Sequence, residues 1–463
     1  MKLILRNTLS GRKEEFKPIT AGKATMYNCG PTVYFYAHIG NLRAYLFVDI
    51  LKKVLQWNRY EVKQGMNITD VGHLSSDSDE GEDKMTKALK REGKPLTMEA
   101  MKEVATFYEK AFIADIQAMN IEKPELLPRA SDNIAADIAL IKKLEENGYT
   151  YIISSGVYFD TSKFPEYGKL GGINLEGLKE GARVNINPEK KNPADFNLWK
   201  LDDKLGWESP WGKGFPGWHI ECSAMSAKYL GQPFDIHTGG VDHIGTHHNN
   251  EIAQSESAFG MPLAHYWLHN EHLNLSGVKM AKSDKDNFIT LHTVVDKGFS
   301  PLDYRYYLLG AHYRSPMTFS WEALESARNA RRRLLDLLSG KNDAGKINAD
   351  YLEHFTSAVN DDLNTPEALA VLWNLLRDER IEIDDKKTTA FEFDKILGLK
   401  LEESIRAISE EVMPASITGL VIKREEAREQ NNWIESDRLR DEINKLGYEI
   451  KDTNSGPKLK KIM

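Results

Sequence analysis

The segment from Ala24 to Thr69 constrains the fold of this chain more than any other part of the sequence. Apolar and β-branched residues from Ala24 to Tyr34 predict a β-strand, and the turn-forming sequence Cys29-Gly30-Pro31 marks its end. An apolar stripe at helical spacing follows from Leu42 to Leu55, and the residues from Glu61 to Thr69 predict a second strand. A strand, a helix and a strand in this order form a βαβ unit. The sequence therefore predicts a parallel, doubly wound α/β sheet.

The same α/β pattern returns later in the chain, after a stretch of different character. Residues 149–172 carry signals of short strands and lead into a region rich in Gly, Lys and Asn up to Pro193, which indicates an insertion. Residues 217–231 then predict a helix that ends at Gly231, residues 234–242 predict a strand, and residues 247–260 predict a helix closed by Gly260. Beyond Ser300 the sequence becomes helical and charged, and it ends in a basic tail.

Composition restricts the classes of protein to which the chain can belong. Its 463 residues allow two to four domains, and 41% hydrophobic with 28% charged residues are typical of a globular protein. No run of apolar residues is long enough for a membrane span, and the N-terminus lacks the pattern of a signal peptide, so we expect a cytoplasmic protein without a membrane partner. The net charge of −8 argues against indiscriminate binding of polyanions, although local basic patches can still bind nucleic acid.

The chain has only two cysteines, Cys29 and Cys222, which cannot form a disulfide framework. His247 and Glu251 are four residues apart and project from one face of the predicted helix. Zinc takes thiolate, imidazole and carboxylate ligands, so these residues are candidates for one metal site. Small buried thiols and an exposed helical pair explain the same residues equally simply. Spacing alone does not bring Cys29 next to Cys222.

Three further motifs carry residue types that suit a nucleotide. In AHIGNLR, His38 and Gly40 lie where the first strand gives way to a helix, whose N-terminus can bind phosphate. In DIHTGGVDH, glycines and an acidic residue suit a ribose or an adenine. In GVKMAKSD, two lysines can neutralise a leaving pyrophosphate. Taken singly, each motif is explained as well by an ordinary turn or a solvated basic loop.

Together and in this order, the motifs resemble those of the cysteinyl-tRNA synthetase family of class I aminoacyl-tRNA synthetases. AHIGN is similar to the HIGH signature and KMAKS to the KMSKS signature of that class. Further matching peptides run from about Tyr27 to about Asp452, namely NCGPTVY, NITDVGH, GEDKM, GARV, NPADFNLWK, GWHIECSAM, DIHTGGVD, HHNNEIAQSE and DDLNTPEAL. Each peptide is short and weak evidence by itself, but so many peptides in the correct order are specific for this family.

The resemblance implies a reaction and a role for each matching residue. The enzyme is expected to ligate L-cysteine to tRNA(Cys) through a cysteinyl-adenylate, with ATP and Mg2+ as substrate and one Zn2+ per chain. The implied zinc ligands are Cys29, Cys222, His247 and Glu251, with His248 as a less certain neighbour. The implied contacts of cysteine are Trp218 and Thr69. The implied catalytic and ATP-binding residues are His38, Gly40, Asn41, His237, Gly239, Gly240, Asp242, Lys279 and Lys282, of which His38, Lys279 and Lys282 are assigned to catalysis.

The zinc has a physical purpose in this expectation. Serine has nearly the shape of cysteine, and a pocket that only fills space discriminates such pairs by about a hundredfold. A thiolate is a much better zinc ligand than a hydroxyl, so the metal is expected to recognise the substrate thiol. A separate editing domain is then not needed.

The resemblance also implies the order of the domains. A Rossmann-type parallel-sheet catalytic domain, interrupted by a connective insertion, precedes an α-helical bundle and a small C-terminal anticodon-binding domain. The expected ranges are the two catalytic halves at 1–125 and 199–270, the insertion at 126–198, the KMAKS and stem-contact region at 271–320, the helical bundle at 321–402 and the C-terminal domain at 403–463. A monomer is expected.

The sequence departs from the family pattern at three places, and three rival functions stand beside the expected one. Asn41 replaces the second His of HIGH, Ala281 replaces a Ser of KMSKS, and the C-terminus lacks the usual Gly-Thr-x-Trp ending. One rival is a related enzyme that ligates cysteine to a sugar amine and lacks the anticodon-binding domain. The others are a zinc hydrolase and a nucleic-acid-binding module with a structural zinc, neither of which has a use for AHIGN and KMAKS.

Overall fold

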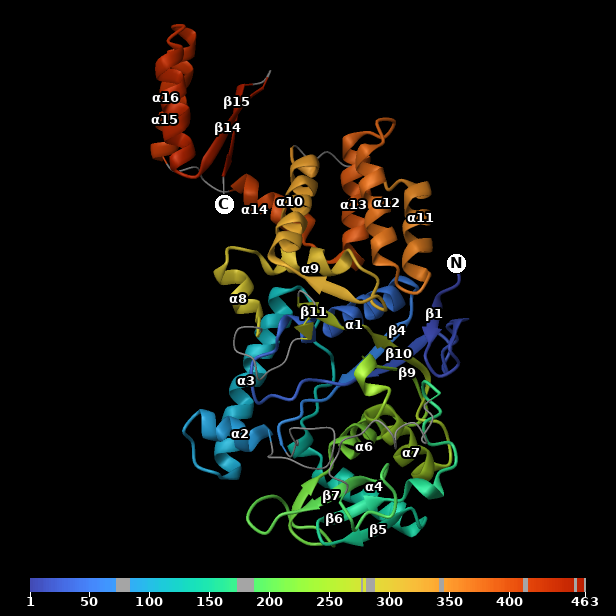
Figure 1. Cartoon of the computed structure of the whole chain (residues 1–463). Coiled ribbons are helices and arrows are strands. Elements are labelled where there is room, and N and C mark those ends of the chain that lie inside the picture. Colours follow the sequence, from blue (N-terminus) through green and yellow to red (C-terminus); the bar gives the residue numbers. More distant parts are fainter. Residues whose placement is uncertain are drawn as a thin grey trace. The chain divides into compact units, whose positions relative to one another are not determined.

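The computed structural model describes the chain except for residues 72–83, 173–186, 276–277, 280–287, 341–344, 411–414, 454–455 and 462–463. The chain forms two compact units, an N-terminal unit of residues 1–400 and a C-terminal unit of residues 401–463. Figure 1 shows the elements of each unit.

The centre of the N-terminal unit is a sheet of four parallel strands in the order β10–β9–β3–β4. Its strands are β3 (Lys23–Asn28), β4 (Glu61–Met66), β9 (Phe234–Gly240) and β10 (Ala264–Asn270). Helix α1 (Ile39–Trp57) joins β3 to β4, and α7 (His247–Phe259) joins β9 to β10. The predicted βαβ unit is therefore present. Because all four strands are parallel, their carboxyl ends lie at one edge of the sheet, where ligands bind in such folds.

The long connection from β4 to β9 carries the insertion. Its antiparallel sheet has the order β5–β6–β7–β8, with β5 (Thr150–Ile153), β6 (Gly156–Phe159), β7 (Phe196–Leu201) and β8 (Gly214–Pro216). The helices of this connection are α2 (Lys84–Arg91), α3 (Met98–Ala118), α4 (Ile134–Glu146) and α6 (Trp218–Leu230), with short turns η1 (Ala130–Asp132) and η2 (Thr161–Lys163). The boundary that we expected after residue 198 falls inside β7, and the inserted sheet continues to Pro216.

The rest of the N-terminal unit surrounds the sheet with short strands and helices (Figure 1). The strands are β1 (Ile4–Asn7), β2 (Arg12–Glu15), β11 (Leu273–Leu275), β12 (Val278–Lys279) and β13 (Met317–Phe319). The helices are η3 (Val241–His243), α8 (Leu291–Asp296), α9 (Pro301–Leu309), α10 (Trp321–Leu338), α11 (Ala349–Asn360), α12 (Thr365–Arg377) and α13 (Ile383–Leu397). The helical character predicted after Ser300 is present.

The C-terminal unit combines helices with a hairpin that the sequence did not reveal. The helices are α14 (Leu401–Glu410), α15 (Ala415–Glu429) and α16 (Trp433–Lys445), and the antiparallel strands are β14 (Tyr448–Thr453) and β15 (Gly456–Lys461). Apolar and charged residues alternate only over the four residues from Tyr448 to Lys451, and lysines surround Leu459 in β15, so the alternation is too short to have marked the hairpin.

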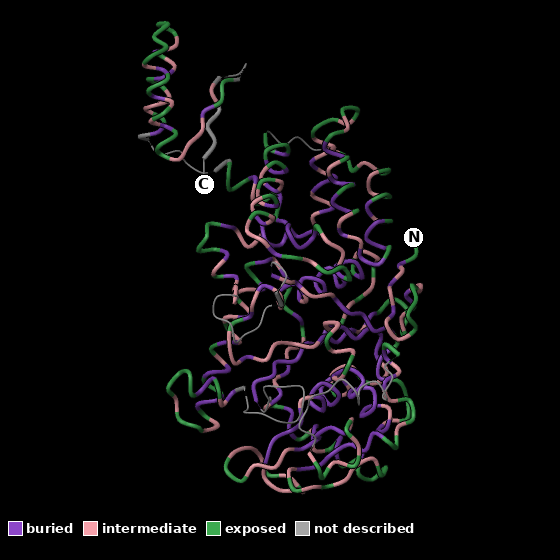
Figure 2. Tube along the Cα trace, viewed as in Figure 1, coloured by how far each residue is buried: buried purple, intermediate pink, exposed green. Residues whose placement is uncertain are grey.

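A buried core packs α6 and α7 against the strands of the central sheet (Figure 2). Its members include Tyr27 of β3, Phe234 of β9, Trp267 of β10, Ile252 of α7 and Cys222 of α6. Glycines end both helices, because Gly231 and Gly260 adopt the positive φ angles of +85° and +67° that other residues avoid. This packing fixes the side chains that face the edge of the sheet.

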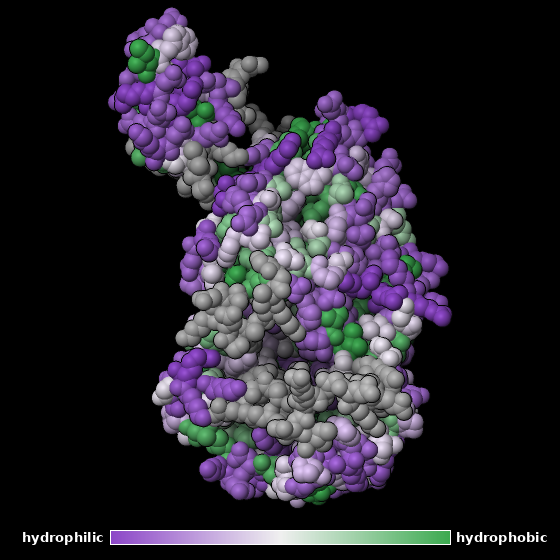
Figure 3. Space-filling view, in the orientation of Figure 1, coloured by the Kyte–Doolittle hydropathy of each residue, from purple (hydrophilic) through white to green (hydrophobic). Residues whose placement is uncertain are grey.

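The face shown in Figure 3 is mostly hydrophilic, with apolar residues in scattered patches. Among the described residues, no helix is both long and apolar enough to cross a membrane.

Candidate active site and metal centre

Four residues from three elements converge at the carboxyl edge of the central sheet. Cys29 directly follows β3, Cys222 lies on α6, and His247 and Glu251 lie one turn apart on α7. One ligand atom from each of the four residues lies within 4.8 Å of the others. The structure thus brings together the residues that the sequence suggested but that spacing alone left apart.

A second grouping shares two of these residues. The ligand atoms of Cys29, His237, His248 and Glu251 also lie within 4.8 Å of one another. Sγ of Cys29 is 3.4 Å from Nε2 of His248 and 3.9 Å from Oε1 of Glu251. The two groupings therefore compete for the same thiol and the same carboxylate.

Hydrogen bonds distinguish the residues that face the centre from those that hold them. Oε2 of Glu251 lies 2.9 Å from Nε2 of His237, whereas Oε1 lies 3.1 Å from Nε2 of His247. The other nitrogen of His247, Nδ1, is 2.8 Å from Nδ1 of His219. Nδ1 of His248 is 2.7 Å from Nε2 of His269. Such outer contacts orient imidazole and carboxylate ligands of a metal.

The charges of the centre are unusual for a buried site. A hydrogen bond from Cys29 lowers the pKa of the Cys222 thiol to about 6, whereas burial and this neighbouring thiol raise the pKa of Cys29 well above its ordinary value. Burial would raise the pKa of Glu251, but the neighbouring His237 and His247 outweigh it and lower this pKa to about 2. Burial would lower the pKa of His247, but Glu251 and Cys222 outweigh it and raise this pKa to about 10. The chain thus gathers a thiolate and a carboxylate in a buried place, where the protonated His247 balances only one of the two negative charges and a further cation would balance the other.

The donor set fits zinc. Two sulfur atoms, one imidazole nitrogen and one carboxylate oxygen are ligands that zinc accepts in proteins. Nε2 of His247 is buried and makes no hydrogen bond of good geometry with the described residues, as expected of a nitrogen aimed at a metal. We therefore favour the grouping of Cys29, Cys222, His247 and Glu251, in which His237 holds the carboxylate from behind.

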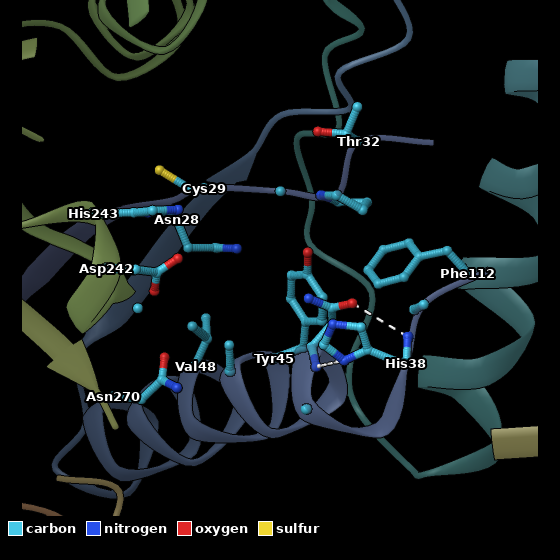
Figure 4. Close-up of a pocket in the computed structure, with 18 of the residues that line it drawn as sticks. Asn28, Cys29, Thr32, His38, Tyr45, Val48, Phe112, Asp242, His243 and Asn270 are labelled. Atoms are coloured by element: carbon cyan, nitrogen blue, oxygen red, sulfur yellow. Dashed lines mark hydrogen bonds between the residues drawn. The ribbon is translucent and has the colours of Figure 1, made fainter. Parts of the chain in front are cut away.

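A cavity of about 580 Å³ opens in front of this centre. Figure 4 shows Cys29, Asp242 and His243 on one side of it, and His38 and Phe112 on the other. The lining residues that the sequence singled out are Cys29, His38, Gly40, Asn41, Trp218, Cys222, Gly239, Gly240, Asp242 and His247. The cavity therefore joins the predicted metal ligands to most of the predicted ATP and cysteine contacts.

His38 caps the N-terminus of α1. Its Nδ1 accepts a hydrogen bond from the backbone N–H of Asn41 at 3.1 Å, and the Asn41 side-chain oxygen accepts one from the backbone N–H of His38 at 3.2 Å (Figure 4). This reciprocal pair is a capping box, and it gives Asn41 a structural role at the position where the family signature has its second His. Because Nδ1 accepts, the proton of a neutral His38 ring lies on Nε2.

Trp218 and the glycines of β9 shape the wall beside the metal centre. Trp218 is the first residue of α6, and its ring lies 4.2 Å from the ring of His247. A Cβ on Gly239 would lie 2.6 Å from both His243 and His248, and one on Gly240 would lie 2.3 Å from Oδ1 of Asp242. Gly239 therefore leaves no room for a side chain beside the two histidine rings, whereas the exposed Asp242 side chain could move away from a Cβ at position 240.

Two predicted contacts lie elsewhere than expected. His237 is fully buried, stacks on Trp267 with ring centroids 4.5 Å apart and bonds to Glu251, so it lies behind the metal centre instead of beside a nucleotide. Thr69 is also buried and does not line the cavity. Its backbone N–H donates to the carbonyl of Pro31 at 3.0 Å, which supports the loop after Cys29.

Of the two KMAKS lysines, one lies within the described residues and one outside them. Lys279 ends β12 and its backbone pairs with Asn274 of β11, whereas Lys282 lies in the segment that the structure does not describe. The structure places the start of this motif on a hairpin that follows β10.

Several residues of the site were not predicted from the sequence. His219 and His269 hold the rings of His247 and His248, and His243 lies 5.0 Å, ring to ring, from His247. Arg43, inside AHIGNLR, donates to four backbone carbonyls, two in the segment that precedes β11 and two in the segment that precedes β13. The only signal in the sequence was the crowding of histidines around DIHTGGVDH and HHNNE, which does not assign individual roles.

Models of two known protein domains match the N-terminal unit of the chain. A model of the class I (C) tRNA synthetase catalytic domain matches residues 15–329, and a model of the DALR domain matches residues 354–400. The cysteine–tRNA ligase of Treponema denticola is 46% identical over 498 residues, covering 100% of both chains. Cysteine–tRNA ligase 1 of Burkholderia lata is 47% identical over 465 residues, covering 99% of this chain and 97% of the relative.

A solved structure shares the fold at low sequence identity. The methionyl-tRNA synthetase of Mycobacterium tuberculosis, bound by methionyl-adenylate, superposes with a TM-score of 0.54 and 14% identity. The match covers 81% of this chain and 90% of that one. At this identity the likeness concerns the fold alone.

Proposed function

Because the chain belongs to the cysteine–tRNA ligase family of class I tRNA synthetases, it charges tRNA with cysteine at the expense of ATP, and we propose that it does so through a cysteinyl-adenylate and with zinc as the selector of the thiol. One observation carries the zinc proposal. Two thiols, an imidazole and a carboxylate meet within 4.8 Å, and three of these residues line the cavity that also holds His38.

The zinc would be held by Cys29, Cys222, His247 and Glu251. When bound, it supplies a soft, positively charged partner for a substrate thiolate, which a serine hydroxyl cannot match. His237 orients the carboxylate through Glu251 Oε2, and His219 does the same for the ring of His247. Trp218 closes the side of the pocket next to this ring.

In the first step the cysteine carboxylate attacks the α-phosphate of ATP, and the bond to pyrophosphate breaks. The N-terminus of α1 presents backbone N–H groups and a partial positive charge to the phosphates. His38 donates from Nε2, because its Nδ1 already accepts from Asn41. Positioning and charge stabilisation, more than a strong base, lower the barrier of such a step.

The remaining contacts of ATP complete the proposal. Gly239, Gly240 and Asp242 lie at the end of β9 and in η3, on the metal side of the cavity, and are proposed to contact the adenylate. Lys279 and Lys282 are proposed to stabilise the charge of the departing pyrophosphate, with Mg2+ bound to ATP. In the second step the terminal ribose of tRNA(Cys) takes the cysteinyl group, and residues 403–463 are proposed to read the anticodon.

The sugar-ligase alternative has the same first step. It is disfavoured because the tRNA-ligase relatives match the whole chain, including the C-terminal unit. The test of the proposal is ATP–pyrophosphate exchange. We expect exchange that depends on cysteine and that serine does not support. Equal exchange with the two amino acids would end the proposal that zinc selects the thiol.

A further inference from the structure

Five aromatic residues form a surface at the mouth of the cavity, which we call the aromatic rim. Three of them, Tyr34, Phe35 and Tyr36, lie in the loop between β3 and α1, and two, Phe107 and Tyr108, lie on α3. Tyr36 meets Phe107 and Tyr108 edge to face, with ring centroids 6.2 Å and 5.1 Å apart. Phe35 and Tyr108 are 5.8 Å apart, so the rings form one continuous group.

The outer rings of the aromatic rim are exposed. Phe107 is 56% exposed and Tyr36 is 38% exposed, whereas Tyr108 beneath them is buried. The two exposed rings are neighbours, with centroids 6.2 Å apart, and a contiguous exposed apolar patch is typical of a binding surface. Four members, Tyr34, Phe35, Tyr36 and Tyr108, line the same cavity as His38. The rim is therefore continuous with the site of the reaction.

A basic helix adjoins the aromatic rim. Helix α2 packs against α3, has no acidic residue, and exposes Lys87, Lys90 and Arg91. The guanidinium of Arg91 lies 4.3 Å from the ring centre of Phe35, and its Nη2 donates to the carbonyl of Tyr34 at 2.8 Å. This contact fixes the basic helix beside the aromatic rings.

Proteins that bind single-stranded nucleic acid commonly combine aromatic rings with clustered cations. Bases stack on the rings whatever their identity, and the cations attract the phosphates. A protein partner would not need the basic helix, and a lipid surface would not need rings at the mouth of a catalytic cavity. The reaction itself requires the unpaired 3′ end of tRNA at this cavity, because its terminal ribose accepts the cysteinyl group.

We propose that the aromatic rim binds the unpaired 3′-terminal nucleotides of tRNA, with a base stacked on Phe107 and Tyr36 and the phosphates facing α2. The proposal rests on the proposed function and concerns only its second step. The rim would guide the terminal ribose toward the adenylate without contacting cysteine or ATP. Phe107 and Tyr36 are thus positioning residues for the transfer.

The test separates the two steps in Phe107→Ala and Tyr36→Ala variants of the full-length chain. We expect cysteine-dependent ATP–pyrophosphate exchange to stay within about twofold of the wild type, because this step uses no tRNA. We expect kcat/KM for tRNA in aminoacylation to fall by roughly 5- to 50-fold, the usual cost of losing one stacked base. Phe107→Trp keeps a stacking face and is expected to retain most of the activity. Ile19→Ala, at a side chain that is 46% exposed, is the matched control.

A second readout reports stacking directly. A tRNA with 2-aminopurine at the 3′-terminal position is expected to lose fluorescence on binding the wild type and to lose much less on binding Phe107→Ala. Unchanged aminoacylation in both alanine variants would overturn the proposal while leaving the proposed function intact. An equal fall in exchange and in aminoacylation would also overturn it, because the rim would then serve the first step of the reaction. Absence of exchange in the wild type would instead contradict the proposed function.

Discussion

Nε2 of His237 lies 2.9 Å from Oε2 of Glu251, and both side chains are fully buried. This contact occupies one oxygen of the carboxylate and leaves the other, Oε1, 3.1 Å from His247 Nε2. His237 therefore determines which oxygen of Glu251 faces the thiols. Its role is to orient a ligand of the metal centre.

Replacing His237 by Ala is expected to weaken zinc binding about 10- to 100-fold, the usual effect of losing a residue that orients a ligand. Competition with a chelator measures the affinity. His265→Ala, on the exposed part of β10, is the matched control and should bind zinc like the wild type. Normal zinc affinity in the His237 variant would contradict the orienting role.

The two groupings of ligand atoms predict different effects of single substitutions. If Cys222 is a ligand and His248 is not, Cys222→Ser loses the zinc and His248→Ala retains it. Metal analysis of the purified variants, with circular dichroism to verify folding, measures this difference. Retention of zinc by Cys222→Ser together with loss in His248→Ala would establish the other grouping.

Arg43 links the AHIGN helix to the β11 hairpin on which the KMAKS motif begins. Its Nη1 donates to the carbonyls of Glu271 and His272 at 3.0 Å and 2.5 Å, and its Nη2 donates to Ser315 at 2.5 Å. A lysine has no planar fork with which to hold several carbonyls. We expect Arg43→Lys to lower exchange about 10- to 100-fold through misplacement of the hairpin, with zinc content unchanged.

The control for this substitution is Arg380→Lys, at a side chain that is 87% exposed. It should leave exchange unchanged. Full activity of Arg43→Lys would show that the hairpin keeps its place without the guanidinium.

A buried ion cluster holds α1 against the helices that follow the catalytic sheet. Asp49 lies 2.7 Å from Arg305 and 2.8 Å from Lys53, and Arg305 also donates to the carbonyl of Leu397 at 2.6 Å. Burial would raise the pKa of Asp49, but the two cations outweigh it and hold this pKa below its ordinary value. The stability from this shift is therefore present above the pKa of an unfolded Asp, about 4, and is lost as the pH falls through the lower folded value.

Asp49→Asn leaves both cations buried without their counter-charge. We expect it to lower the free energy of unfolding at neutral pH by about 3–5 kcal/mol, measured by denaturant titration. The difference from the wild type should start to shrink below about pH 4, where the Asp of the unfolded chain takes up a proton, and should disappear once the pH falls below the lower pKa of Asp49 in the folded protein. A difference that stays constant with pH would show that the charge of Asp49 is not the cause.

The sequence predicted those parts of the structure that local patterns determine. Apolar periodicity located β3, α1 and β4, and glycines located the ends of α6 and α7. The hairpin of β14 and β15 was not predicted, because Tyr448 and Ile450 alternate with charged residues over four positions only, which is too short a run to stand out after α16.

The site was harder to predict because it depends on contacts between distant segments. Cys29 and Cys222 come together only because the sheet packs β3 and α6 around one core. His237 stands two residues before a glycine turn, which suggested a nucleotide contact, but side chains alternate along a strand. Only the packing of α7 on β9 shows that this ring points at Glu251.

X-ray absorption at the zinc edge, with and without L-cysteine, tests the central claim that the metal recognises the substrate thiol. Two sulfur ligands from the protein are expected in the free enzyme, and a third is expected when cysteine is added but not when serine is added. Sulfur coordination that stays the same in the presence of saturating cysteine would contradict the account.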